Sequence, residues 1–159
     1  MPILQLLLLL IIANGGPILA RKLLRRRFAW PVDGGRRFRD GRPLLGEAKT
    51  WRGILAALLL SALCAPLLGL SVVWGLLIGA ASMAGDLLSS FIKRRLAYPS
   101  SSMALGLDQI PESLLPALLA AGELQLGMLD IVLVVALFFV AELILSRLLF
   151  RMGIRKQPY

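Results

Sequence analysis

Long apolar runs separated by short basic segments are the feature that most restricts how this chain folds. Of its 159 residues 58% are hydrophobic, and its 18 Lys and Arg residues fall within three clusters, at 21–52, 93–95 and 147–156. Apolar runs of about 20 residues are long enough to cross a bilayer as helices. We therefore predict an all-α integral membrane protein in which residues 1–159 form a single domain.

Five apolar segments are predicted to be transmembrane helices, close to residues 3–20, 53–70, 71–92, 111–126 and 128–146. The first is interrupted by Asn-Gly-Gly-Pro at 14–17, which predicts a kink or a break that either serves packing or lines a site. With five spans, both polar loops and the tail lie on one side. The positive-inside rule then predicts a multi-pass cell-membrane protein with its N-terminus outside and its loops and C-terminus in the cytoplasm.

The charge distribution narrows the range of partners. The formal net charge is +9 and the chain contains no His and a single Cys, Cys64, inside an apolar run. A basic chain can bind nucleic acid, but basic clusters between apolar runs favour a membrane surface or a phosphate-bearing substrate instead. Without His, and with its one Cys in an apolar run, the chain lacks disulfide frameworks, Cys/His metal sites and the usual nucleophile–base pairs.

The third apolar segment carries a polar stripe. Residues spaced by four, four and three positions lie on one helix face, and here they are Ser82, Asp86, Ser90 and Lys93. A carboxylate at membrane depth costs about 2.5–3.5 kcal/mol, so Asp86 is expected to have a compensating cation. That cation is either a bound metal ion or, in a purely structural role, an arginine of the first loop.

The first loop combines glycine turns with cations. It contains Asp-Gly-Gly at 33–35, Asp-Gly at 40–41 and Lys-Thr at 49–50. Glycines allow tight turns that expose N–H groups to an anion, and Arg and Lys side chains bind phosphate. A loop that only orients the protein in the membrane explains residues 21–27, whereas the spaced pattern at 33–53 favours phosphate binding. The spacing of a P-loop is absent.

Carboxylates and cations are predicted to meet at the cytoplasmic face. Mg²⁺ is held by one or two carboxylates together with substrate phosphates, and phosphoryl or nucleotidyl transfer requires mainly positioning and charge neutralisation. An apolar groove beside Asp86 would hold lipid tails with the head group at its mouth. The acidic residues expected on or near this face are Asp33, Asp40, Glu47, Asp86 and Asp108.

Several ordered motifs resemble the CDP-archaeol synthase family of integral-membrane CTP:lipid cytidylyltransferases, which is similar to the CDP-diacylglycerol synthases. They are Asp-Gly-Gly-Arg-Arg at 33–37, Asp-Gly at 40–41, Lys-Thr-Trp-Arg-Gly at 49–53, Gly-Asp-Leu at 85–87, Ser-Phe-Ile-Lys-Arg-Arg at 90–95 and Gly-Leu-Asp-Gln at 106–109. The resemblance covers nearly the whole chain. It implies five transmembrane helices, with two cytoplasmic loops forming the active site.

The resemblance also implies a reaction, in which CTP and a lipid phosphate give a CDP-lipid and pyrophosphate with Mg²⁺. Its implied catalytic residues are Asp86, Asp108, Lys93 and Lys49, and its implied metal ligands are Asp86 and Asp108, with Glu112 as a further candidate. The residues implied to bind CTP or the lipid phosphate are Asp33, Gly34, Gly35, Arg36, Asp40, Thr50, Arg52, Ser90 and Arg94.

The chain departs from the family pattern after Asp108. Pro111 stands where the family commonly has an acid, and Glu112 follows it. This departure keeps open a catalytically impaired lipid-phosphate binding or transport protein. A different membrane glycerophospholipid enzyme such as an acyltransferase, which would share the basic loops and short glycine turns, is a second alternative. Gly75 and Gly79 would permit close helix contacts within one chain or between chains, so the sequence leaves the oligomeric state open.

Overall fold

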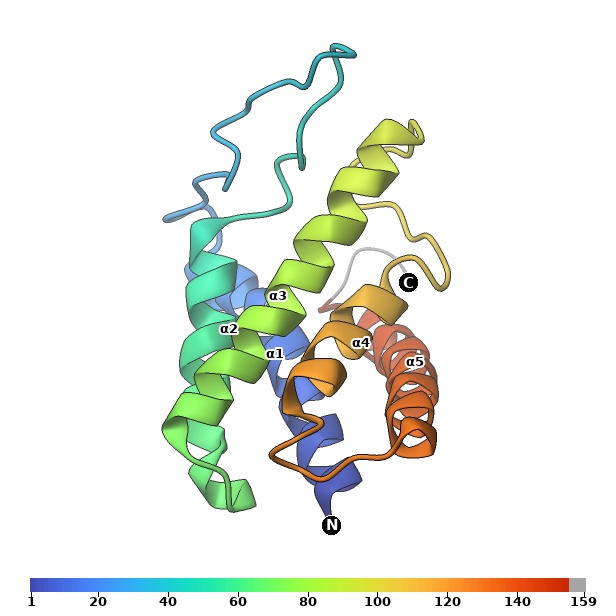
Figure 1. Ribbon diagram of the computed structural model, residues 1–159. Coiled ribbons are helices and arrows are strands. Elements are labelled where there is room, and N and C mark those ends of the chain that lie inside the picture. The colour runs from blue at the N-terminus through green and yellow to red at the C-terminus, as the bar shows by residue number, and fades with distance from the viewer. Residues whose placement is uncertain (155–159) are drawn as a thin grey trace.

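The computed structural model describes residues 1–154, and its regular elements over that range are helices (Figure 1). Arg155 and Lys156 of the third basic cluster lie outside the described residues. The elements are α1 (Pro2–Leu24), α2 (Trp51–Cys64), the 3₁₀ helix η1 (Pro66–Leu68), α3 (Val72–Arg95), α4 (Gln109–Ala120) and α5 (Met128–Arg151).

Three of these helices are long and apolar enough to cross a membrane. They are α1, α3 and α5, with 23, 24 and 24 residues and mean hydropathies of 2.2, 1.6 and 2.7. Helices α2 and α4 have 14 and 12 residues, or roughly 21 and 18 Å of helix, against a hydrocarbon core of about 30 Å. The helices therefore lie where the apolar runs predicted them, while five complete membrane crossings stay a prediction.

Helix α1 runs without interruption through the Asn-Gly-Gly-Pro sequence. The predicted break therefore does not occur, whereas a kink stays a prediction. Gly16 packs on α2 so closely that a Cβ atom there would lie 2.8 Å from the backbone nitrogen of Ala57. The glycine thus permits close packing of α1 on α2, and Pro17 stays inside the helix.

Helix α3 lies against α1, α2 and α4 (Figure 1). It also carries the polar stripe. Its glycines are packing positions: a Cβ on Gly75 would overlap the backbone of α2 at Ser61, and one on Gly79 would lie 3.1 Å from the Ser61 hydroxyl. The close approach predicted from this glycine pair occurs within the chain. An apolar core that includes Leu9 of α1, Ile78 of α3 and Phe138 of α5 fills the space between the helices.

The loop between α1 and α2 rises beside the C-terminal end of α3 (Figure 1). Two isolated β-bridges, Pro31 with Thr50 and Arg37 with Pro43, fold it back on itself. The side chain of Arg95 fastens the loop to α3, because its guanidinium donates to Asp40 at 2.5 Å and lies 4.7 Å from the ring centre of Phe38. Lys49 is thereby held at the loop end that leads into α2.

Candidate active site

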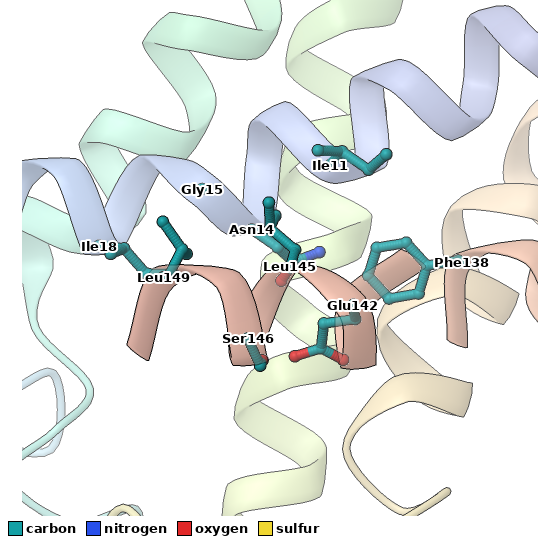
Figure 2. Close-up of a pocket in the computed structure, with 9 residues that line it drawn as sticks. All are labelled: Ile11, Asn14, Gly15, Ile18, Phe138, Glu142, Leu145, Ser146 and Leu149. Atoms are coloured by element: carbon teal, nitrogen blue, oxygen red, sulfur yellow. The ribbon is translucent and has the colours of Figure 1, made fainter. Parts of the chain in front are cut away.

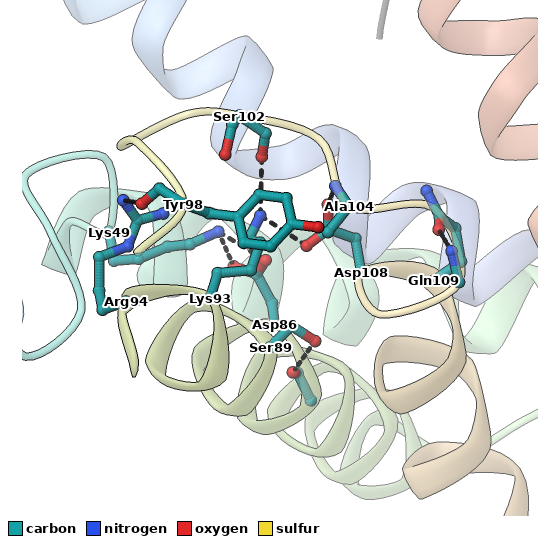
Figure 3. A network of polar contacts seen from close by, with 12 residues as sticks. Lys49, Asp86, Ser89, Lys93, Arg94, Tyr98, Ser102, Ala104, Asp108 and Gln109 are labelled. Atoms are coloured by element: carbon teal, nitrogen blue, oxygen red, sulfur yellow. Dashed lines mark hydrogen bonds and ion pairs between the residues drawn. The ribbon is translucent and has the colours of Figure 1, made fainter. Parts of the chain in front are cut away.

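An ion pair between the first loop and the polar stripe forms the centre of the site (Figure 3). The Nζ atom of Lys49 lies 2.5 and 2.6 Å from the two carboxylate oxygens of Asp86. The side chains are 23% and 19% exposed, so the pair is partly shielded from solvent. Burial opposes the charge on Lys49, yet the Asp86 carboxylate raises the pKa of this lysine above its ordinary value. The compensating cation is therefore a lysine of the first loop, and not one of its arginines.

A second pair joins the end of α3 to the start of α4 (Figure 3). The Nζ atom of Lys93 lies 2.6 Å from Oδ1 of Asp108 and donates to the backbone carbonyl of Ser102 at 2.9 Å. The other oxygen of Asp108 accepts from the backbone N–H of Ala104 at 2.8 Å. The second loop thus supplies an acceptor that orients Lys93.

Glu112 extends this cluster from α4. It is only 5% exposed, and its carboxyl group lies within hydrogen-bonding range of the Asp86 carboxylate. The two helices come close because Gly85 has no side chain, and a Cβ there would overlap the backbone carbonyl of Pro111. The acid that follows Pro111 therefore reaches the central carboxylate, even though the position expected to carry an acid is a proline.

These acidic side chains suit Mg²⁺ in the type of ligand atom they offer. Asp86, Asp108 and Glu112 supply only oxygen, the donor that Mg²⁺ prefers, and this ion usually takes one or two carboxylates and completes its shell with water and substrate phosphates. In residues 1–154 no group of three or more Asp, Glu, His or Cys side chains is close enough to hold a metal alone. The residues therefore fit a metal ion shared with a substrate phosphate.

Arg94 offers a cationic donor beside the second pair. Its Nη1 donates to the carbonyl of Tyr98 at 2.6 Å, while its buried Nε has no hydrogen-bond partner among the described residues. A buried N–H without a partner is costly, and a phosphate oxygen would satisfy it. Ser90, one turn earlier on α3, is 2% exposed and lies within the polar stripe as predicted.

Asp33 directs its carboxylate into its own loop. Its oxygens accept the backbone N–H groups of Gly35 at 3.0 Å, Leu45 at 2.9 Å and Gly46 at 3.1 Å. Burial opposes the charge, but these donors lower the pKa of Asp33 below its ordinary value. Gly34 and Gly35 have φ of 58° and 74°, the left-handed conformations that the turn requires. This part of the predicted phosphate cradle thus shapes the loop.

Four other predicted residues form no hydrogen bond or ion pair with the side chains of the two lysine–aspartate pairs. Asp40 pairs with Arg95, and Arg36 is exposed. Thr50 begins α2 without a side-chain cap. The Arg52 Nη1 donates to the carbonyls of Arg25 and Arg27, each at 2.7 Å, at the end of α1. The residues that come together are Lys49, Asp86, Lys93, Arg94, Asp108 and Glu112.

One contribution was missed in the sequence. Arg95, read only as part of a basic run, holds the first loop in place, and nothing in the run distinguishes it from its neighbours. Asn14 of α1 donates to the hydroxyl of Ser82 at 3.1 Å, so α1 contributes to the inner end of the stripe. Asn14 also lines a small cavity between α1 and α5 together with Phe138 and Glu142 (Figure 2).

Comparisons with known proteins give consistent matches. The family model for CarS-like CDP-archaeol synthases matches residues 27–72 and 64–159. A CDP-archaeol synthase of Hyperthermus butylicus is 40% identical over 121 residues, which cover 69% of this chain and 67% of that protein. One from Pyrobaculum calidifontis is 40% identical over 125 residues, with coverage of 74% and 73%. The match to a third CDP-archaeol synthase, from Thermococcus gammatolerans, covers 53% of that protein, so this chain spans about half of its length.

A solved structure agrees with these matches. The chain superposes on an intramembrane enzyme for archaeal membrane lipid biosynthesis with a TM-score of 0.72 and 31% identity, covering 89% of this chain and 90% of that one. The prediction of a membrane enzyme that forms a CDP-activated lipid is thereby confirmed and favoured over the binding-protein and acyltransferase alternatives. By the family model over most of its length, and by relatives at 40% identity, this chain belongs to the CDP-archaeol synthase family.

Proposed function

We propose that this chain transfers the CMP group of CTP to an ether-linked lipid phosphate, with CDP-archaeol as the product and pyrophosphate as the leaving group. An oxygen of the lipid phosphate attacks the α-phosphorus of CTP. The bond from that phosphorus to the bridging oxygen breaks, and pyrophosphate leaves with the electron pair. The observation that carries this proposal is the cluster of two lysine–aspartate pairs, Glu112 and Arg94 where the polar stripe of α3 ends.

The cationic and the acidic side chains of the cluster have different roles in this reaction. Lys49, Lys93 and Arg94 bind phosphate oxygens and neutralise the negative charge that two phosphate-bearing substrates bring together. Asp86 and Asp108, with Glu112 beside them, would hold Mg²⁺, which when bound supplies further charge neutralisation and orients the phosphates. Both lysines are paired with these carboxylates before substrate arrives, so they are already oriented for phosphate.

The lipid nucleophile reaches the cluster from within the bilayer. Ser82, Asp86, Ser90 and Lys93 lie along one face of α3 toward its basic end, and α3 also carries exposed apolar side chains such as Leu88. We place the two loops and the C-terminus in the cytoplasm and the N-terminus outside, because this orientation puts the basic clusters inside and gives CTP access to the cluster.

Asp86→Asn tests the proposal. We expect this change to lower kcat/KM about 100-fold or more, because it removes a charge that acts on the phosphates. Purified protein in detergent is incubated with labelled CTP, Mg²⁺ and an ether-linked or ester-linked lipid phosphate, and CDP-lipid and pyrophosphate are measured, with a metal-chelated sample alongside.

Asp130→Asn is the matched control, since Asp130 accepts only the backbone N–H of Gly127 at the start of α5. It should retain wild-type turnover. Wild-type turnover by a folded Asp86→Asn protein would exclude the role given to Asp86. Activity with the ester-linked lipid alone would overturn the assignment of the product.

A further inference from the structure

An apolar groove lies between the C-terminal end of α1 and the first half of α2. Its volume is about 370 Å³, within the usual range for small-molecule sites. The small side chains of Ala20 and Ala56 leave the hollow, and Leu55 and Leu59 of α2 form one wall. The groove shares no residue with the lysine–aspartate cluster, so it is a separate feature of the molecule.

Aromatic side chains at one end of the groove place it at the level of the lipid head groups. Phe28, Trp30 and Trp51 line it and are 58%, 67% and 50% exposed. Tryptophan concentrates where the hydrocarbon core meets the head groups, because its ring is apolar and its N–H group is polar. The remaining apolar length of the groove, along Leu55 and Leu59, then extends toward the hydrocarbon.

The chain next to this aromatic end is strongly cationic. Five exposed cations lie within seven residues, namely Arg21, Lys22, Arg25, Arg26 and Arg27. None of them forms an ion pair with another described residue. Arg52 lines the groove and donates to the carbonyls of Arg25 and Arg27, which holds the cationic turn beside it. The groove therefore has two parts. Its apolar trough lies along Leu55 and Leu59, and its positive rim consists of the exposed cations at 21–27.

This combination selects among the possible occupants. A second copy of the chain docked symmetrically through this face would bring two positive rims together, which is unfavourable at close range. A zwitterionic lipid fills the trough but leaves the rim without a net counter-charge. An anionic amphiphile satisfies both features, with a chain in the trough and its phosphate at the rim.

We propose that an anionic phospholipid of the surrounding bilayer binds in this α1/α2 groove. One of its chains lies along Leu55 and Leu59, and its phosphodiester contacts the cations of 21–27. This site goes beyond the proposed transfer reaction and does not rest on it, because its occupant keeps its phosphodiester bonds and stays bound as a lipid.

Native mass spectrometry of lipid-bound protein tests the site. Delipidated protein in detergent is titrated with phosphatidylglycerol, which is anionic, or with phosphatidylcholine, which is zwitterionic. We expect phosphatidylglycerol to be retained in preference. Arg25→Gln/Arg26→Gln should weaken its binding about tenfold or more, since each cation near an anionic head group contributes about a fivefold factor. Ala56→Phe should block the trough and lower retention of both lipids.

Two matched controls separate this site from general attraction. Arg147→Gln/Arg151→Gln removes two exposed cations at the end of α5, and Leu63→Phe adds bulk at a 70% exposed position of α2 outside the groove. Both should retain the lipid as wild type does. Equal retention of the two lipids, unchanged binding by the Arg25/Arg26 variant, or a protein dimer in place of a lipid adduct would overturn the proposal. Should Ala56→Phe not fold, the paired arginine variants decide alone.

Discussion

The aspartates of this protein are each held by specific partners, and the partners differ in kind. Asp86 and Asp108 are paired with lysines, at 2.5 and 2.6 Å. Asp33 instead accepts three backbone N–H groups of its own loop. Carboxylates that looked equivalent in the sequence therefore have separate roles, two within the ionic cluster and one that determines the shape of the loop.

The role of Asp33 predicts a pH dependence. Its pKa is lowered in the folded protein, so the ionised group stabilises the loop above its ordinary pKa of 3.8, and this contribution is lost as the pH falls through the lower, folded value. The protection factors of the Leu45 and Gly46 amides against hydrogen exchange should be high at neutral pH and fall in acid. Asp33→Asn should lose about 2 kcal/mol of this protection at neutral pH, because charged acceptors make the stronger bonds.

Glu47→Gln serves as the control, since Glu47 is an exposed acid of the same loop. It should leave the exchange of both amides unchanged. If Asp33→Asn exchanged these amides at the wild-type rate at neutral pH, the loop-shaping role of Asp33 would be wrong.

At the scale of elements, helix α3 organises the molecule through two faces. Its glycines allow α2 and α4 to pack closely, and its polar stripe receives partners from α1, from the first loop and from α4. Gly85 precedes Asp86, so the contact that brings α4 close also brings Glu112 to the central carboxylate. Helix packing and the assembly of the site therefore depend on the same few positions.

Gly85→Ala tests this dependence. The added methyl group would overlap the backbone carbonyl of Pro111, which a rotamer change cannot relieve. We expect a loss of about 1–3 kcal/mol in stability, measured by thermal unfolding in detergent, together with loss of CDP-lipid formation. Gly122→Ala is the matched control, because a Cβ there meets nothing within 4 Å. Equal stability of the two variants would contradict the packing described here.

The attachment of the first loop to α3 gives another prediction at this scale. Arg95→Gln removes the ion pair with Asp40 and the contact with the Phe38 ring. We expect KM for CTP to rise roughly tenfold with a smaller change in kcat, since the loop that carries Lys49 would be ordered only on binding. Asp40→Asn should shift KM in the same direction, and exposed Arg39→Gln should leave it unchanged. A fall in kcat alone would assign Arg95 to the chemistry instead.

At the scale of the whole molecule, the loops that complete the ionic cluster lie toward one end of the helix bundle (Figure 1). The two short helices, α2 and α4, carry or adjoin Lys49, Asp108 and Glu112. Because the cluster joins residues of several segments, the site exists only when the bundle is assembled.

Cysteine labelling tests the orientation of this bundle. In a Cys64→Ala background, Arg39→Cys reports on the first loop and Gly122→Cys on the turn after α4. With a membrane-impermeant maleimide and intact cells, we expect Gly122→Cys to react and Arg39→Cys to react only after the cells are opened. Labelling of Arg39→Cys in intact cells would reverse the orientation we propose.

Much of the fold and part of the site were predictable because they depend on local sequence. Apolar runs determined where the helices lie, and the helical repeat placed Ser82, Asp86, Ser90 and Lys93 on one face. The break predicted as one alternative for α1 does not occur, because close packing on α2 supports the helix through Pro17. A pattern of single residues contains no information about such a neighbour.

The sequence by itself determined which residues are polar inside an apolar helix, since that follows from order along the chain. Only the tertiary structure decided their partners. It paired Asp86 with Lys49, brought Glu112 to it across the Gly85 contact, and turned Arg52 away to the end of α1. These outcomes depend on how a folded loop and three packed helices meet, because residues distant in sequence become neighbours only through close backbone contacts.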